Sequence, residues 1–406
     1  MFKIKTLNEI SPLYKEILSE SEYSVSKDEA QPDAIIVRSA DMHEMEVPAS
    51  LLAVGRAGAG YNNIPVEEYG RMGIVAFNTP GANANAVKEL ALAALLLASR
   101  DIVGGIEWCK TIADQGDAVP KLVEKGKKQF VGPELKGKTL GVIGLGGIGG
   151  LVANAAISLG MKVLGYDPYI SVDNAWKLSR EIVHASSEDQ IYAQSDYVSI
   201  HIPLRDDTKG SFNASVFAKM KKGAVLLNLA RGELVKNADV LAALESGQLR
   251  KYVTDFPNAE IVGKPGVIAI PHLGASTPES EDNCVDMVSR QIDEYLKYGS
   301  IRNSVNYPAC ELGPNFRQRI AVMHANVPNT IGTITSTVAS AGINIDNMTN
   351  KSRGAFAYTV LDLDEKATPE VISSLNAMDM VYRVRVFDQS PKAVNLPPEA
   401  MPIAES

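Results

Sequence analysis

The chain alternates short apolar runs with amphipathic stretches over most of its length. Among the first ninety or so residues, the runs FKIKTL, DAIIVRS, LLAVGRAG and GIVAFNTP are separated by helical patterns such as SPLYKEILSE and AVKELALAALLLASR. Short runs bounded by Gly, Pro, Asn or Asp indicate strands, and apolar residues spaced three and four apart indicate helices. The alternation of the two patterns predicts an α/β domain.

A second series of the same kind begins near Lys138. Its strand-like runs are TLGVIGLG, KVLGYDP, YVSIHIP, GAVLLNLA, KYVTDF and VIAIPH. They are nearly continuous in apolar residues and have helical segments between them, which is typical of a doubly wound parallel sheet of the Rossmann type. The amphipathic run EDNCVDMVSRQIDEYLKYG that follows predicts one long helix, which returns the chain to the first domain.

Beyond the connection NYPACELGP the pattern changes. It predicts the order strand, helix, strand, strand, helix, strand in about seventy residues, which fits a ferredoxin-like βαββαβ unit. We therefore expect a discontinuous, flavodoxin-like substrate-binding domain, a Rossmann-type cofactor domain, a small C-terminal domain and a Pro-rich flexible tail. Their predicted boundaries are, in that order, 1–95 with 285–312, then 96–284, then 317–390, and then 391–406.

Composition narrows the class of protein. The 406 residues suggest two or three domains, and 45% hydrophobic residues are ample for their cores. The net charge is −8 and no long basic block occurs, so we expect neither nucleic acid nor a membrane surface as partner. The chain start lacks an apolar signal core and no run of about 18 apolar residues occurs, which favours a cytoplasmic protein. The chain has three cysteines, which are widely spaced, so we predict neither a disulfide nor a metal site.

The strand TLGVIG leads into Gly144, Gly146 and Gly149, and a helical stretch follows at once. Glycines at this spacing between a strand and a helix permit a tight turn, the approach of a pyrophosphate, and close helix packing. The next strand ends at Asp167, about 20 residues on, where a carboxylate accepts hydrogen bonds from a ribose and repels a 2′-phosphate. These features predict an NAD site, and the alternative is a structural turn with a solvated carboxylate.

Three polar residues follow successive strands of this sheet. Arg231 follows AVLLNLA, Glu260 follows KYVTDF and His272 follows VIAIP. Each alone is ordinarily a solvated charge or a structural histidine, but ligands of doubly wound sheets lie beyond these strand ends. Together they fit the oxidation of a 2-hydroxy acid, with His272 as base, Glu260 as its carboxylate partner, and Arg231 gripping the substrate carboxylate.

The segments VGRAGAGYNNIPV, FNTPGANANAV, GVIGLGGIGG, HIPL, MKKGAVLLNLARGELV and PHLGAST closely resemble the D-2-hydroxyacid dehydrogenases. The resemblance implies that Arg231, Glu260 and His272 are the catalytic trio and that Asp255 hydrogen-bonds the nicotinamide carboxamide. It also implies a wider set of NAD contacts, namely Gly144, Gly146, Gly147, Ile148, Gly149, Asp167, Pro203, Ala230, Asp255, His272 and Gly274.

Within this family the C-terminal unit resembles an ACT regulatory domain, which implies the substrate 3-phospho-D-glycerate and the effector L-serine. A phosphorylated substrate needs extra cations, which Arg38 and Arg56 can supply, while backbone N–H groups can receive its carboxylate. Those N–H groups are predicted at Gly58, Ala59 and Gly60. The segments HANVPN and GINI resemble serine-binding segments, whose matching positions are His324, Asn326 and Asn344.

Several alternatives stay open at this point. Arg38 and Arg56 can be surface charges, Lys88 can be a further phosphate ligand or a solvated lysine, and the last domain can serve assembly alone. Asn329 stands where the family turn more often has glycine, and asparagine tolerates a positive φ. Rival functions are a glyoxylate, hydroxypyruvate or 2-oxoglutarate reductase and a non-enzymatic NAD-sensing corepressor. A homodimer or homotetramer is the default assembly.

Overall fold

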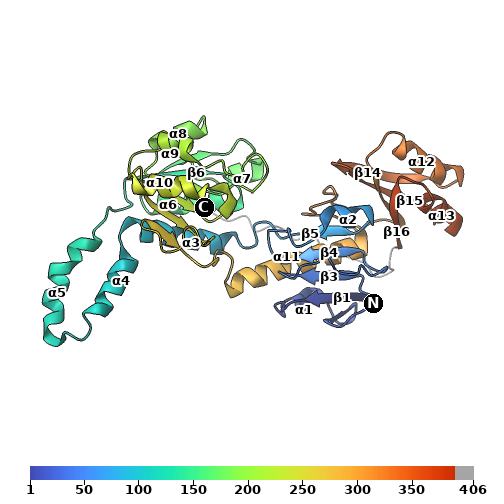
Figure 1. Ribbon diagram of the computed structural model, residues 1–406. Helices are drawn as coiled ribbons and strands as arrows, with labels where there is room; N and C mark the ends of the chain where they lie inside the picture. The colour runs from blue at the N-terminus through green and yellow to red at the C-terminus, as the bar shows by residue number, and fades with distance from the viewer. Residues whose placement is uncertain (389–406) are drawn as a thin grey trace, which may run out of the picture. The chain divides into compact units, whose positions relative to one another are not determined.

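The computed structural model describes residues 1–388 and divides into two compact units (Figure 1). Among the described residues, unit 1 consists of Met1–Ala82 and Glu281–Asp388, and unit 2 is Asn83–Ser280. The predicted tail 391–406 lies outside the described residues. None of the helices in residues 1–388 is both long and apolar enough to cross a membrane.

Unit 1 contains a five-stranded parallel sheet. Its strands are β1 (Phe2–Leu7), β2 (Tyr23–Ser26), β3 (Ala34–Val37), β4 (Ala53–Arg56) and β5 (Val75–Phe77), in the order β2-β1-β3-β4-β5. This is the flavodoxin-like order, as predicted. The short helices α1 (Tyr14–Ile17) and α2 (Val66–Arg71) connect the strands.

The long helix α11 (Pro278–Tyr298) belongs to the core of unit 1. Its buried side chains Val285, Val288, Ile292 and Tyr295 pack in one cluster with residues of the parallel sheet. At Gly55 of β4 an added Cβ would lie 2.3 Å from Cγ2 of Val288, so only glycine lets the helix approach this closely. The predicted amphipathic helix is confirmed.

The C-terminal part of unit 1 is a four-stranded antiparallel sheet of order β14-β15-β13-β16 with helices α12 (Thr330–Ser340) and α13 (Pro369–Asn376). Its strands are β13 (Gln318–Ala325), β14 (Ile345–Arg353), β15 (Phe356–Leu363) and β16 (Val381–Asp388). The element order confirms the predicted βαββαβ unit. One face packs on the two helices, while Met323, Tyr358 and Phe387 join the cluster that holds α11.

Unit 2 is built on a seven-stranded parallel sheet of order β12-β11-β10-β9-β6-β7-β8, which confirms the Rossmann-type prediction. The strands are β6 (Thr139–Ile143), β7 (Lys162–Tyr166), β8 (Val183–His184), β9 (Tyr197–Ile200), β10 (Ala224–Asn228), β11 (Leu249–Thr254) and β12 (Val267–Ala269). The helices that join them are α6 (Gly147–Ser158), α7 (Val172–Trp176), α8 (Glu188–Gln194), α9 (Ala214–Lys219) and α10 (Asn237–Glu245).

Helix α3 (Ala84–Ser99) lies in unit 2, whereas the sequence placed the start of the cofactor domain at residue 96. The reason is its packing. Its small buried residues Ala91, Ala94 and Ala98 share a cluster with Val152 and Ala156 of α6. Small side chains let two helices approach closely, so α3 buries its apolar face within this unit.

A helical hairpin of α4 (Ile102–Thr111) and α5 (Val119–Gly126) projects from unit 2 (Figure 1). Trp108 of α4 packs on Phe130, which follows α5, with ring centroids 5.6 Å apart. The outer apolar residues of the hairpin stay exposed, including Val103 at 48% and Ile106 at 53%. The hairpin thus keeps an apolar surface that no core within residues 1–388 covers.

Candidate active site

The Gly-rich turn joins β6 to α6 in unit 2. Gly144 has a φ of 87°, and an added Cβ there would lie 2.5 Å from the carbonyl oxygen of His201. An added Cβ at Gly149 would lie 1.9 Å from the carbonyl oxygen of Gly144. Gly146, by contrast, faces open space within 4 Å, and no side chain caps the N-terminus of α6. Two glycines therefore serve packing, and the third leaves room for a phosphate at the helix N-terminus.

Asp167 directly follows β7 and lies beside this turn. Its Oδ2 accepts a hydrogen bond from the Leu145 N–H at 2.9 Å, and its Oδ1 accepts one from the Tyr169 N–H at 2.9 Å. The carboxylate is therefore oriented by backbone on both sides, and each oxygen keeps a lone pair for a ribose hydroxyl. The geometry fits the adenosine half of a dinucleotide.

The predicted catalytic residues follow adjacent strands. Asn228 of β10 is opposite Thr254 of β11, and Thr254 is opposite Ala269 of β12. Arg231, Asp255 and His272 come one to three residues beyond these ends, at one edge of the sheet. Of the other predicted NAD contacts, Pro203 follows β9, Ala230 lies in the turn before Arg231, and Gly274 follows His272.

Asp255 is 2% exposed, and its Oδ2 accepts a hydrogen bond from the Gly274 N–H at 3.3 Å. Burial raises the pKa of this carboxyl above its ordinary value, and the neighbouring His272, the Gly274 N–H and Arg231 partly oppose the rise. A buried carboxyl with a perturbed pKa and specific neighbours is a candidate functional group.

His272 is exposed, and its imidazole packs on the ring of Phe256 at a centroid distance of 4.7 Å. Glu260 accepts a hydrogen bond from Asn237 at 2.8 Å instead. Within residues 1–388 no hydrogen bond or ion pair joins Glu260 to His272, so the predicted pair is not formed in this structure. Phe256 and Asn237 are contacts that sequence reasoning missed.

Arg231 is exposed and presents its guanidinium from a turn that a buried amide fixes. Asn228 donates to the carbonyl oxygen of Arg231 at 2.8 Å and accepts from the Ala230 N–H at 3.2 Å. Asn228 is fully buried at the end of β10. Its two bonds close the turn, so this asparagine orients the backbone that carries Arg231.

The predicted phosphate ligands lie together at the carboxyl edge of the unit 1 sheet. Arg56 ends β4, its Nε donates to the carbonyl oxygen of Arg38 at 3.0 Å, and its Nη1 donates to the carbonyl oxygen of Gly60. Arg38 follows β3 and forms an ion pair with Glu281 of α11, a partner that the sequence did not predict. Gly58 has a φ of 157° in the loop that also holds Ala59. Lys88 lies in unit 2 and donates to Asn85 at 2.6 Å.

The structure does not bring the three predicted serine ligands together within one chain. His324 is 2% exposed and contacts Thr359 at 2.8 Å, and burial lowers the pKa of its imidazole. Asn326 donates to the carbonyl oxygen of Gly354 at 3.0 Å. Asn344 precedes β14 at the other end of the sheet, roughly 20 Å away for six residues of strand. The expectation of one cluster in adjacent positions is therefore wrong for a single chain.

Asn329 adopts a φ of 66° just before α12, which confirms that asparagine tolerates this left-handed position.

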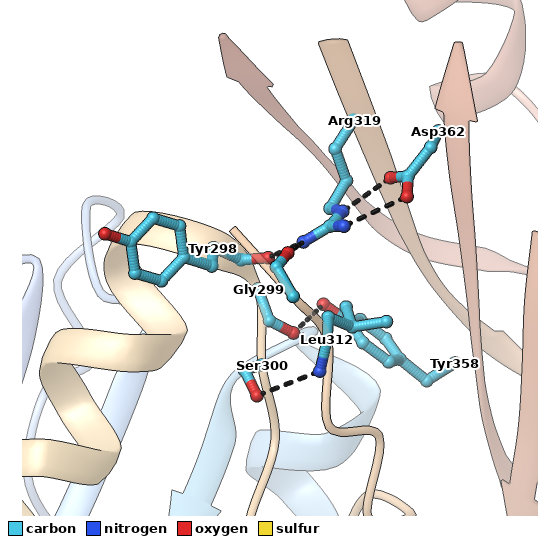
Figure 2. Close-up of polar contacts among 8 residues, drawn as sticks. Tyr298, Gly299, Ser300, Leu312, Arg319, Tyr358 and Asp362 are labelled. Carbon is cyan, nitrogen blue, oxygen red and sulfur yellow. Dashed lines mark hydrogen bonds and ion pairs between the residues drawn. The ribbon is translucent and has the colours of Figure 1, made fainter. Parts of the chain in front are cut away.

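The C-terminal sheet is anchored by a residue that the sequence did not single out. Figure 2 shows Arg319 between Asp362 and the carbonyl oxygen of Tyr298, at the end of α11. Nearby, the Tyr358 hydroxyl donates to the carbonyl oxygen of Gly299 at 2.8 Å. The antiparallel sheet is thereby tied to α11 by buried polar contacts.

Most of unit 2 matches a known protein-family model. Residues 92–274 match the family model described as D-isomer specific 2-hydroxyacid dehydrogenase, NAD binding domain. The matched segment contains the Gly-rich turn, Asp167 and the polar residues at the sheet edge. The match supports the prediction of a domain that binds NAD.

The chain is 34% identical over 337 residues to D-3-phosphoglycerate dehydrogenase of Synechocystis sp., covering 80% of this chain and 57% of that protein. It is 36% identical over 286 residues to the protein of the same name from Rattus norvegicus, covering 68% and 51%. The chain thus spans about half the length of the curated relatives it matches. A crystal structure of NAD+-bound 3-phosphoglycerate dehydrogenase from Entamoeba histolytica has a TM-score of 0.59 and 26% identity, covering 75% of this chain and 98% of that chain.

Proposed function

We propose that the chain is a cytoplasmic, NAD-dependent D-3-phosphoglycerate dehydrogenase. It oxidises 3-phospho-D-glycerate to 3-phosphohydroxypyruvate, the first step of L-serine biosynthesis. The observation that carries the proposal is the position of Asp255, His272 and Arg231, which follow three adjacent parallel strands by one to three residues at one edge of the unit 2 sheet. The similarity to proteins named D-3-phosphoglycerate dehydrogenase supports the choice of substrate.

In this proposal the N-terminus of α6 holds the pyrophosphate and Asp167 holds the adenosine ribose. Asp255 fixes the orientation of the nicotinamide through its carboxamide. When bound, NAD+ supplies the hydride acceptor. Three observations support these roles. There is open space at Gly146, no side chain caps the N-terminus of α6, and two backbone N–H groups orient the Asp167 carboxylate.

The proton is handled by His272. Neutral imidazole accepts the proton of the substrate hydroxyl while hydride leaves the same carbon, so the alcohol becomes a carbonyl and the imidazole becomes an imidazolium. Glu260 stabilises that imidazolium, and Arg231 holds the carboxylate beside the reacting carbon. In the reverse direction the imidazolium returns the proton.

The substrate phosphate is assigned to Arg38 and Arg56, and the carboxylate also to N–H groups of the Gly58–Gly60 loop. In the structure the Arg38 guanidinium is paired with the Glu281 carboxylate, so in this proposal the substrate phosphate takes the place of that carboxylate. The rival substrates, glyoxylate, hydroxypyruvate and 2-oxoglutarate, carry no phosphate. A phosphoglycerate dehydrogenase therefore needs these arginines for substrate binding, whereas the rival reductases do not.

We predict that kcat/KM for NADH production is higher with 3-phospho-D-glycerate than with D-glycerate, glycolate or D-2-hydroxyglutarate. Arg38→Ala should lower kcat/KM for the phosphorylated acid by roughly tenfold or more, since a charge-assisted bond contributes about 1.5–3 kcal/mol, and should leave D-glycerate little changed. Arg71→Ala, at an exposed arginine paired with Glu67 in the same unit, is the matched control. An equal or better rate with an acid that lacks phosphate would favour the rival reductases.

The C-terminal βαββαβ unit is, in this proposal, an ACT-like domain that binds L-serine through His324, Asn326 and Asn344. Since one chain keeps Asn344 at the far end of the sheet, the site requires two copies of the domain. We predict that added L-serine lowers NADH production in the wild type, and that Asn344→Ala weakens this inhibition while uninhibited turnover changes little. Inhibition that is absent in the wild type would leave the domain with an assembly role alone.

We also propose that the chain forms a homodimer or homotetramer, supported by the exposed apolar surface of the α4–α5 hairpin. The change Ile106→Asp should lower the molecular mass measured by sedimentation velocity. Trp176→Asp, at an exposed apolar residue of α7 in the same unit, is the control that should leave the mass unchanged. A wild-type protein that sediments as a monomer would contradict the proposal.

A further inference from the structure

The phenyl ring of Phe256 lies against the imidazole of His272. The two ring centroids are 4.7 Å apart, and the ring planes make an angle of 45°. Ser276 donates to the backbone carbonyl oxygen of His272 at 3.4 Å, whereas within residues 1–388 no hydrogen bond or ion pair holds the imidazole itself. The aromatic contact is therefore what restrains the orientation of this exposed ring.

One buried residue, Thr254, ties down the backbone on both sides of this contact. Thr254 ends β11 and is fully buried. Its Oγ1 accepts from the Phe256 N–H at 3.1 Å, and its carbonyl oxygen accepts from the Ile270 N–H at 2.8 Å. Ile270 lies two residues before His272, directly after β12. The pairing of β11 with β12 thus sets the register in which the two rings meet.

Phe256 also contacts the turn that carries Arg231. An added Cβ at Gly232, the next residue, would lie 3.2 Å from Cβ of Phe256, so the two residues are closely packed. Phe256 is half-buried in this position. One side chain therefore packs against both the turn of Arg231 and the imidazole of His272.

We propose that Phe256 is a positioning residue that holds the His272 imidazole in the orientation in which it accepts the substrate proton. The inference rests on the proposed function, in which His272 is the base. An exposed histidine on a loop otherwise samples several rotamers, and the flat face of a neighbouring ring restricts them. A phenyl ring has no hydrogen-bonding group of its own, so it leaves both imidazole nitrogens free for proton transfer.

The test compares Phe256→Leu with Phe256→Tyr. Leucine keeps an apolar side chain against Gly232 but has no flat face, whereas tyrosine keeps the ring. Phe256→Leu should lower kcat roughly 10- to 100-fold through misplacement of the base, while Phe256→Tyr stays close to wild type. The Kd for NAD should change little in either variant, because the pyrophosphate and ribose contacts lie at the Gly-rich turn. In the His272→Asn background, Phe256→Leu should lower kcat no further.

Phe217→Leu is the matched control, since it makes the same change in the core of the same unit. Phe217 is a buried residue of α9. Its carbonyl oxygen accepts from Gln248, which directly precedes β11 and so lies at the opposite edge of the sheet from His272. This variant should keep the wild-type kcat.

A second measurement does not require turnover. NMR relaxation of the His272 side chain, assigned from the resonance that is missing in His272→Asn, reports the mobility of the imidazole in the free protein. Phe256→Leu should make this ring more mobile and shift its resonance through loss of the phenyl ring current, and Phe217→Leu should do neither. In the wild type itself, the His272 ring should be more ordered than that of His184, an exposed histidine of β8 without an aromatic neighbour among residues 1–388.

Three results would overturn the inference. They are a wild-type kcat in an active Phe256→Leu enzyme, a further loss of kcat when Phe256→Leu is added to His272→Asn, and a wild-type His272 ring as mobile as that of His184. If the wild type oxidises no 2-hydroxy acid but its His272 ring loosens in Phe256→Leu, the proposed function fails and the positioning contact stands.

Discussion

Replacing His272 with asparagine is expected to lower turnover by roughly 10²- to 10⁴-fold, the loss typical of removing a general base. Asparagine keeps a polar side chain of similar reach but cannot accept the substrate proton near neutral pH. His272 is exposed and its ring packs only on Phe256 among the aromatic rings of residues 1–388, so the fold should tolerate the change. The measurement is kcat for NADH production, together with the Kd for NAD by calorimetry.

The Kd for NAD should stay within a small factor of the wild-type value, because the pyrophosphate and ribose contacts belong to the Gly-rich turn and Asp167. His184→Asn serves as the control, since that histidine is exposed on the edge strand β8. A His272→Asn protein with wild-type kcat would remove His272 from the mechanism and would also remove the basis for the role of Glu260.

Much of the fold was accessible from the sequence because buried parallel strands are continuous apolar runs. The runs TLGVI and AVLLN became β6 and β10, and the glycine spacing between a predicted strand and a predicted helix located the turn after β6. Helix α1 was overestimated, since the pattern over residues 11–20 forms a helix only at Tyr14–Ile17. The α4–α5 hairpin was missed, because its apolar residues cover no core of the sheet that follows.

The polar contacts of the site were harder to predict because they join residues far apart in sequence. Asn237 and Glu260 are 23 positions apart, and neither spacing nor residue type relates them. Strand polarity explains the error over the serine ligands, since an antiparallel sheet sends the start of β14 away from the end of β13. One signal was available and overlooked, namely a charged residue in each of two mostly apolar strands, Arg319 in β13 and Asp362 in β15.

These two residues form the buried ion pair with the largest expected effect on stability. Arg319 is 2% exposed, and its guanidinium lies 2.6 Å and 3.0 Å from the two oxygens of Asp362. It also donates to the carbonyl oxygen of Tyr298 at 2.9 Å (Figure 2) and to that of Gly313 at 3.0 Å. One side chain therefore connects β15, the end of α11 and the segment that leads into β13, satisfying a helix carbonyl that would otherwise lack a partner.

Arg319→Met should destabilise unit 1 by about 3–5 kcal/mol, since it leaves the Asp362 carboxylate with no cationic partner in a buried position. Adding Asp362→Leu to this variant should recover much of that loss, because it removes the uncompensated charge. Arg317→Met is the matched control. Arg317 is exposed, two residues away, and donates to the carbonyl oxygen of Asp364, so its loss should cost about 0.5 kcal/mol or less.

Hydrogen exchange in β13, β15 and α11 is the suitable measurement, because both tryptophans, Trp108 and Trp176, lie in unit 2 and do not report on unit 1. In Arg319→Met the three elements should lose protection together, since the arginine links all of them, while the strands of unit 2 keep theirs. Loss of protection confined to β13 would mean that the sheet and α11 are held by their shared apolar cluster alone. A variant that matches Arg317→Met in every element would show that the buried pair adds no net stability.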